Sequence, residues 1–308
     1  MKMLKNNHFI NCPLCGMDNY QLLYSSTESP VLKINSADRC NSVYDLSKHG
    51  DIMQCRHCGM VYNNPQPDPV SLLNFYRKAS DPLYLQEKQA RECMFKHSLE
   101  QVHEFITPPG KLLDVGCFTG IFMKVAASMG WKVEGIELSS WAADLARKTG
   151  IGTIYEQPLE QILFPENSFD VITLWDVIEH LSHPVEMLTE ARRVLKPGGI
   201  LAFNTHMVDS LAGRISGKHY PFFMIIHLIH FSRTTVTRML NEHGYELLDI
   251  KPHLHILRIG YFLEELSGKV KSAYFRSFLK RLSTWKKLSN RFIKTRLLGV
   301  ADVFARKK

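Results

Sequence analysis

Apolar and polar positions in the middle of the chain follow a strand-like and then a helix-like period in turn. An apolar run over residues 111–115 predicts a buried strand, and the pattern over residues 121–127 predicts a helix directly behind a glycine turn. A second short strand is predicted over residues 132–136, and Glu137 follows it. Strand, glycine turn, helix, strand and acid is the order of a nucleotide-binding βαβ unit.

The alternation continues on both sides of this unit. Further helices are predicted over residues 70–78, 85–106, 141–148 and 184–195, and further strands over residues 151–155, 169–175 and 200–204. Strands that alternate with helices favour an α/β fold with a doubly wound parallel sheet. The segment 298–307 predicts a last strand at an edge of that sheet.

The glycine turn restricts the kind of ligand. Phe118 stands between Gly116 and Gly120, whereas a dinucleotide turn uses three glycines so that the backbone can approach a pyrophosphate. Asp114 at the strand end would repel phosphate, and it suits a ligand with a positive ammonium group. S-adenosylmethionine carries an ammonium group and a ribose but no phosphate. Glu137 follows Gly116 by 21 residues (137 − 116), the spacing at which an acid holds ribose hydroxyls.

The strand end and turn at Asp114, Gly116 and Gly120 resemble the first motif of the class I S-adenosylmethionine-dependent methyltransferases, Asp-x-Gly-x-Gly-x-Gly. Phe118 replaces the glycine that the family usually has. Later segments resemble, in order, the remaining motifs of the small-molecule type: residues 164–172, 176–181 and 193–199. The resemblance implies a Rossmann-like seven-stranded sheet and transfer of a methyl group to an O, C or N atom. The acceptor would be a small molecule or a glycan or lipid-linked precursor.

The motif match also implies roles for single residues. The implied cofactor-binding positions are Asp114, Gly116, Cys117, Gly120, Glu137, Leu138 and Trp175. Asp114 and Gly116 would line the methionine end of S-adenosylmethionine, and Glu137 would accept hydrogen bonds from both ribose hydroxyls. Leu138 would pack against the adenine, and the face of Trp175 would lie near the sulfonium cation.

A hydroxyl or carbon-acid acceptor must lose a proton, and histidine titrates near the working pH. His180 and His227 are therefore the candidate catalytic bases. Two alternatives stay open: His180 anchors the loop after the fourth strand, and His227, in an apolar run, is a core histidine. Glu179 and His180 are also a candidate pair for a divalent ion.

Two Cys-x-x-Cys-Gly units near the N-terminus predict a structural zinc site. Cys12, Cys15, Cys55 and Cys58 supply the four thiolates of a closed tetrahedral site. Unrelated buried cysteines and a redox pair are the alternatives. The chain has seven cysteines, an odd number that favours a reducing compartment over disulfides. Cys40 is left over, and His57 is a substitute ligand.

With 308 residues, 45% of them hydrophobic, the chain is long enough for one core and a small extra module. Four regions are predicted: a zinc-binding module (1–64), a proline-rich linker with leading helices (65–110), a methyltransferase domain (111–260) and a basic amphipathic C-terminal segment (261–308). An N-terminal four-cysteine module joined to such a domain is similar to sugar C-methyltransferases and related biosynthetic methyltransferases.

The C-terminal segment carries the positive charge. From residue 261 onward there are 13 Lys and Arg and three acids, a net charge of +10, so the rest of the chain has +8 − 10 = −2. Apolar residues are interleaved, which fits packing on the domain, an anionic membrane surface or nucleic acid, the last being less favoured. We expect a cytoplasmic protein without a signal peptide or membrane span, at most peripheral at the inner membrane surface.

Three functions are compared. The first is a methyltransferase for a small molecule or glycan precursor, with S-adenosylmethionine as cofactor and a structural zinc ion. The second is an RNA methyltransferase that grips RNA with its zinc module and basic tail. The third is a non-catalytic binding protein that keeps the fold, supported by the bulk of Phe118 in the glycine turn.

Overall fold

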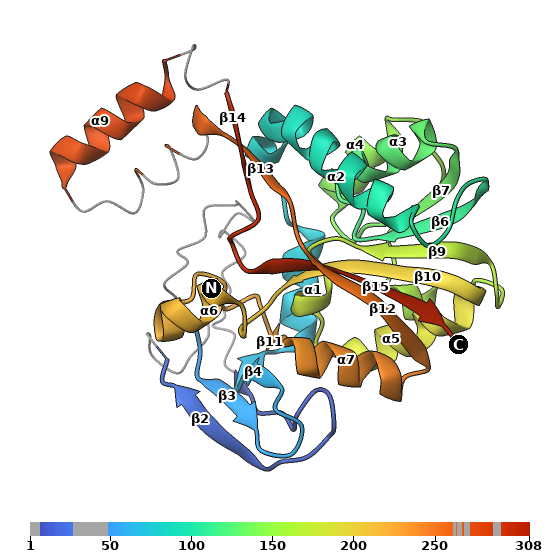
Figure 1. The fold of residues 1–308 in the computed structure, drawn as a ribbon, viewed down its shortest axis with the longest axis horizontal. Coiled ribbons are helices and arrows are strands. Elements are labelled where there is room, and N and C mark those ends of the chain that lie inside the picture. Colours follow the sequence, from blue (N-terminus) through green and yellow to red (C-terminus); the bar gives the residue numbers. More distant parts are fainter. Residues whose placement is uncertain (1–6, 27–48, 261–262, 264–266, 268–271, 286–290) are drawn as a thin grey trace.

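The computed structural model describes residues 7–26, 49–260, 263, 267, 272–285 and 291–308. Its centre is a seven-stranded sheet with the order β12-β15-β10-β9-β6-β7-β8 (Figure 1). The strands are β6 (Gly110–Val115), β7 (Trp131–Ile136), β8 (Ile154–Tyr155), β9 (Phe169–Leu174), β10 (Leu195–His206), β12 (Tyr245–Pro252) and β15 (Val300–Lys307). Parallel pairing joins β8, β7, β6, β9 and β10, so the predicted doubly wound α/β sheet is confirmed there.

The last strand departs from the prediction in two respects. β15 runs antiparallel to both neighbours, so the sheet is mixed. It also lies between β10 and β12, so the prediction of an edge strand at residues 298–307 is wrong. The physical reason is burial: residues Val300 to Ala305 are all buried, whereas β12, which takes the edge, is buried at only two positions. A strand covered on both faces and paired on both sides belongs in the interior of a sheet.

Helices cover both faces of the sheet (Figure 1). One face carries α2 (Lys88–Val102), α3 (Ile121–Ser128) and α4 (Ser140–Arg147), and the other carries α5 (Pro184–Val194) and α7 (Arg233–Glu242). Successive strand residues point to opposite faces. Accordingly, Leu112 of β6 packs on the face that carries α2, α3 and α4, and Leu113 packs on the face that carries α5 and α7.

Shorter elements connect these layers. The segment before β6 supplies α1 (Pro69–Arg77) and the 3-10 turn η1 (Pro82–Glu87), and the segment between β8 and β9 supplies the 3-10 turn η2 (Leu159–Gln161). The segment after β9 supplies η3 (Ile178–His180), and the segment after β10 supplies α6 (Leu211–Ser216) and η4 (Gly217–His219). Ser139 caps α4 by accepting a hydrogen bond from the N–H of Ala142 at 3.1 Å, as its position before the predicted helix suggests.

The cysteine-containing unit is joined to the central domain by a shared sheet. Its strands are β1 (Asn7–His8), β2 (Tyr20–Tyr24), β3 (Ile52–Cys55), β4 (Val61–Asn63) and β5 (Gln66–Pro67). The four-stranded sheet has the order β11-β4-β3-β2, and its strand β11 (Ile229–His230) comes from far along the chain. The division of the chain into four regions therefore stays a prediction, but the first region is completed by residues of the third.

An excursion leaves the sheet between β12 and β15. It contains β13 (His255–Arg258), helix α9 (Ala273–Ser283) and β14 (Phe292–Thr295), and β13 pairs with β14. Figure 1 shows α9 standing apart from the body of the molecule. Among the described residues, every helix is too short or too polar to cross a membrane.

Candidate active site

The parallel strands β6, β7, β9 and β10 all end at the same edge of the sheet, where ligands of open α/β sheets bind. The glycine turn follows β6, and Glu137 follows β7. Trp175 and Asp176 follow β9, and His206 is the last residue of β10. The topology therefore brings most of the predicted site residues to one edge.

The glycine turn packs closely against the residues that follow β9. Gly116 and Gly120 both have φ of 76°, and a Cβ on Gly116 would lie 2.5 Å from Cγ2 of Val177. Phe118 also has a positive φ, 46°, at the position where the resembling family has glycine. Its N–H donates to Oε2 of Glu137 at 2.9 Å. The turn after β6 is thus tied to the acid after β7.

Two buried carboxyl groups flank this turn. Burial raises the pKa of Asp114 to about 8, although the hydroxyl of Thr173, which donates to Asp114 Oδ1 at 2.8 Å, opposes the shift. Burial raises the pKa of Glu137 to about 7, opposed by the N–H groups of Ser139 and Phe118 that donate to its carboxylate. Both acids therefore favour a ligand that brings positive charge or hydroxyl donors.

Aromatic rings surround the turn. The Phe118 ring lies 4.5 Å from that of Tyr84 and 5.7 Å from that of Trp141, between centroids. The guanidinium of Arg91 lies 3.6 Å above the Tyr84 ring. Asp176 and Asp114 act electrostatically on Tyr84, which places η1 close to both acids. Sequence patterns predicted a helix here but gave no signal for Tyr84 or Arg91, because their role depends on how the leading helices fold back over the sheet.

The other predicted cofactor positions are near the same edge. Leu138 is half-buried directly after Glu137. Cys117 is buried, and its side chain packs in the core beneath the turn. Trp175 is buried against Phe122, with its indole N–H lacking a hydrogen-bond partner among the described residues.

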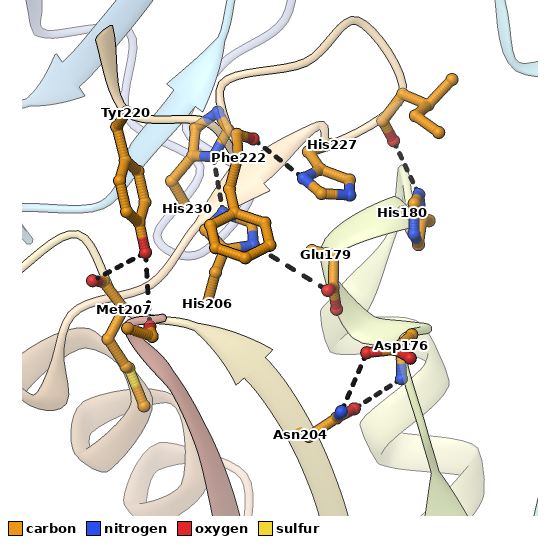
Figure 2. A network of polar contacts seen from close by, with 12 residues as sticks. Asp176, Glu179, His180, Asn204, His206, Met207, Tyr220, Phe222, His227 and His230 are labelled. Atoms are coloured by element: carbon orange, nitrogen blue, oxygen red, sulfur yellow. Dashed lines mark hydrogen bonds and ion pairs between the residues drawn. The ribbon is translucent and has the colours of Figure 1, made fainter. Parts of the chain in front are cut away.

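Asp176 is held in a left-handed conformation, with φ of 56°. Its N–H donates to Oδ1 of Asn204, and Nδ2 of Asn204 donates back to Asp176 Oδ1 at 2.8 Å (Figure 2). This reciprocal pair joins the ends of β9 and β10. It fixes an exposed carboxylate beside Trp175.

The two predicted catalytic histidines meet in space (Figure 2). The ring centroids of His180 and His227 are 4.7 Å apart. Nδ1 of His227 is 2.8 Å from the Phe222 carbonyl, and Nδ1 of His180 is 2.9 Å from the Ile226 carbonyl. Carbonyl oxygens only accept, so Nδ1 carries a proton in each ring, and the lone pair of the neutral form is on Nε2. Both rings are therefore oriented as proton acceptors.

Burial, and then the neighbouring histidines, lower the pKa of His227 well below its usual value. His227 is consequently neutral at physiological pH, the form that can take a proton. Glu179, His180 and His227 each offer one ligand atom, and these atoms lie within 4.8 Å of one another, a spacing that is compatible with a metal ion. A divalent ion at Glu179 and His180 stays a prediction.

A hydrogen-bonded chain extends from these histidines into the cysteine-containing unit. His206 Nε2 lies 2.8 Å from His230 Nδ1, and His230 Nε2 lies 3.0 Å from Asn63 Oδ1. Asn63 Nδ2 donates to the Met224 carbonyl, so its Oδ1 must accept from His230. His230 Nδ1 then accepts from Nε2 of His206, and Nδ1 of His206 lies 3.8 Å from Oε1 of Glu179. No sequence motif predicted this series of hydrogen bonds, because it depends on the pairing of β11 with β4.

The four predicted zinc ligands come together. Sγ of Cys12 is 3.4 Å from Sγ of Cys58, and Sγ of Cys15 is 3.5 Å from Sγ of Cys55. All four sulfurs lie within 4.8 Å of one another. Zinc–sulfur bonds of about 2.3 Å in a tetrahedron place the sulfurs about 3.8 Å apart, so the cluster fits the metal. His57 lies outside the cluster, near Arg238, and Cys40 lies outside the described residues.

Comparisons with known proteins agree with this geometry. Residues 85–250 match the family described as "Methyltransferase domain". The ubiquinone biosynthesis O-methyltransferase of Coxiella burnetii (strain RSA 331 / Henzerling II) is 29% identical over 194 residues, which cover 58% of this chain and 82% of that protein. The enzyme of the same name from Burkholderia pseudomallei (strain 1710b) is 30% identical over 157 residues, covering 46% of this chain and 68% of that protein.

A solved structure supports the fold alone. A chain of the complex between the Haloferax volcanii Trm112 methyltransferase activator and a methyltransferase superposes with a TM-score of 0.50 at 13% identity, covering 72% of this chain and 91% of that chain. The family match spans more than half of the sequence and includes the glycine turn, both buried acids and the two histidines. The chain belongs to the methyltransferase-domain family, and it is a class I S-adenosylmethionine-dependent methyltransferase.

Proposed function

We propose that this enzyme transfers the methyl group of S-adenosylmethionine to a hydroxyl oxygen of a small-molecule acceptor. The observation that carries the proposal is the pair His180 and His227, each held by a backbone carbonyl so that Nε2 is a proton acceptor. A hydroxyl must lose its proton as it is methylated, whereas a neutral amine attacks with its own lone pair. The O-methyltransferase relatives agree with this choice.

The residues at the carboxyl edge fit the cofactor. The turn needs glycine at position 116, because a Cβ there would clash with Val177, and the indole N–H of Trp175 lacks a hydrogen-bond partner among the described residues. In our proposal Asp114 faces the ammonium group and Glu137 faces the ribose hydroxyls. The ammonium group and the ribose hydroxyls would stabilise the ionised form of these two carboxyl groups. Bound S-adenosylmethionine supplies an activated methyl carbon, so the protein needs mainly to orient the acceptor and remove its proton.

His227 is the first candidate base, and His180 is the second. His227 is buried among protein and other histidine rings, and its lowered pKa keeps it neutral. His180 is less buried and also has the Tyr76 hydroxyl 3.0 Å from its Nδ1. Next to these two residues, the hydrogen bonds from His206 to His230 and from His230 to Asn63 fix the orientation of the His206 and His230 rings. If His227 is the base, the rate stays constant as the pH falls to its usual pKa of about 6.5 and declines only below it.

The test measures S-adenosylhomocysteine formation with a panel of phenols, aliphatic alcohols and amines. We expect turnover on hydroxyl acceptors and a fall in kcat of about 10²- to 10⁴-fold in His227→Gln or His180→Gln. Calorimetry should show that these variants still bind S-adenosylmethionine. His183→Gln, which changes an exposed histidine nearby, is the matched control.

Three results would contradict the proposal. If the intact protein fails to bind S-adenosylmethionine, the cofactor site is misassigned. If amines alone are methylated, the acceptor class is wrong. If both histidine variants keep full kcat, the two rings have only the anchoring and core roles.

We also propose that Cys12, Cys15, Cys55 and Cys58 hold a structural zinc ion. Four thiolates close the coordination sphere and leave no position for substrate. The nearby pairing of β4 with β11 suggests what the metal would stabilise, namely the strand that carries Asn63 toward the histidines.

A further inference from the structure

Helix α9 exposes large aromatic side chains to solvent. Leu279 is 4% exposed, whereas Tyr274 is 86% exposed and Phe278 is 48% exposed. Tyr274 and Phe278 are four residues apart and so lie on one stripe of the helix. Trp285, just beyond the helix end, is 58% exposed. Aromatic side chains are therefore turned outward instead of inward.

Basic side chains accompany this stripe. Lys280 and Arg281 are exposed in the last turn of α9. The returning strand β14 and the residues after it repeat the combination: Phe292, Ile293 and Leu297 are exposed among Arg291, Lys294 and Arg296. The sequence contains no acid over residues 272–285 or over residues 291–298. Residues 272–285 and 291–298 therefore present apolar and positively charged groups without an acid among them.

This combination selects one kind of partner. A helix with an apolar aromatic face and Lys or Arg beside it lies in the interface of an anionic bilayer, where the rings enter the headgroup region and the cations meet phosphate. Trp and Tyr are the residues that prefer such interfaces. RNA would attract the cations but would leave Leu297, which is 81% exposed, without a partner.

The excursion is attached next to the active site. Its first strand, β13, follows His253, whose Nδ1 is 2.6 Å from Asp302 Oδ1 of β15. Burial lowers the pKa of His253, but Asp302 and then Asp176 raise it overall, so this connection lies near the acid that follows β9. Figure 1 shows β13 and β14 reaching from the sheet toward α9. We propose that α9 and β14 form a docking surface for anionic phospholipid bilayers, independently of which acceptor the enzyme methylates.

The test is co-sedimentation of the full chain with vesicles of phosphatidylcholine alone or mixed with phosphatidylglycerol. We expect binding to the anionic vesicles only, with at least tenfold weaker binding in the double variant Tyr274→Ser/Phe278→Ser and in Lys280→Glu/Arg281→Glu. Leu163→Ser is the matched control, because Leu163 is 94% exposed on a loop before β9. Circular dichroism and S-adenosylmethionine binding verify that each variant is folded.

Trp285 provides a second readout. Of the four tryptophans, Trp131 and Trp175 are buried and Trp141 is half-buried, so a blue shift of emission on adding anionic vesicles reports Trp285. The shift should disappear in Trp285→Phe. Equal binding to neutral vesicles, unchanged binding of both double variants, or binding to single-stranded RNA without binding to vesicles would overturn the proposal.

Discussion

Replacing Asp114 with asparagine should stabilise the cofactor-free enzyme, although the side chain lies in the proposed cofactor site. Asp114 is 1% exposed, and burial raises its pKa from 3.8 to about 8. Between these values the folded protein keeps a proton that the unfolded chain has released. The unfolded state then binds fewer protons, so the free energy of unfolding decreases as the pH rises from about 4 to about 8.

The magnitude follows from the shift. At pH 7 the difference from the ordinary pKa is 7.0 − 3.8 = 3.2 pH units, and each unit corresponds to about 1.4 kcal/mol, a cost of about 4 kcal/mol. Asparagine cannot ionise and can still accept the hydrogen bond from Thr173. Asp114→Asn should therefore be more stable by up to about 4 kcal/mol at pH 7 and bind S-adenosylmethionine more weakly.

Urea unfolding at pH 5, 6, 7 and 8 measures this effect. The wild-type protein should lose stability across the series, and Asp114→Asn should lose less. A residual slope should remain from Glu137, whose pKa is raised to about 7. Asp144→Asn, at an exposed position on α4, is the control and should not change the slope. A variant that is less stable than the wild type at pH 8, or has an unchanged slope, would refute the reasoning.

Two further predictions concern the turn and the cysteines. Gly116→Ala should destabilise the protein by about 1–3 kcal/mol, because φ is 76° and Val177 blocks the new Cβ; thermal unfolding measures the loss, and Val177→Ala in the same chain should restore part of it. Cys55→Ser should abolish bound zinc in elemental analysis and lower the melting temperature, whereas Cys93→Ser, at an exposed cysteine, should do neither; equal zinc content in both variants would contradict the four-cysteine site.

The sequence predicted the parts of this fold that local patterns determine. The strand before Asp114, the helix after Gly120 and the acid at Glu137 follow one another within a short stretch, and each has a direct period or turn signal. The two Cys-x-x-Cys-Gly units likewise predict a four-cysteine cluster from their spacing alone, and the four sulfurs lie within 4.8 Å of one another.

The parts that the sequence could not predict depend on long-range pairing. The position of β15 is set by which strands remain unpaired after the parallel half has formed, and no local pattern encodes that choice. The hydrogen-bonded series from His206 through His230 to Asn63 depends on the pairing of β11 with β4, and Asn63 is 167 residues away from His230 in the sequence. Tyr84 and Arg91 join the site through the packing of η1 and α2. Such contacts require the tertiary fold.

The place of β15 also governs the order in which the molecule can be built. Residues 300–307 fill the gap between β10 and β12, so during synthesis the sheet stays divided until this segment has left the ribosome. Until then β10 exposes an unpaired edge, and β12 has no neighbour in the sheet. The nascent chain can therefore complete the glycine turn and its acids early, but it can close the sheet only after α9 and β14 have been made.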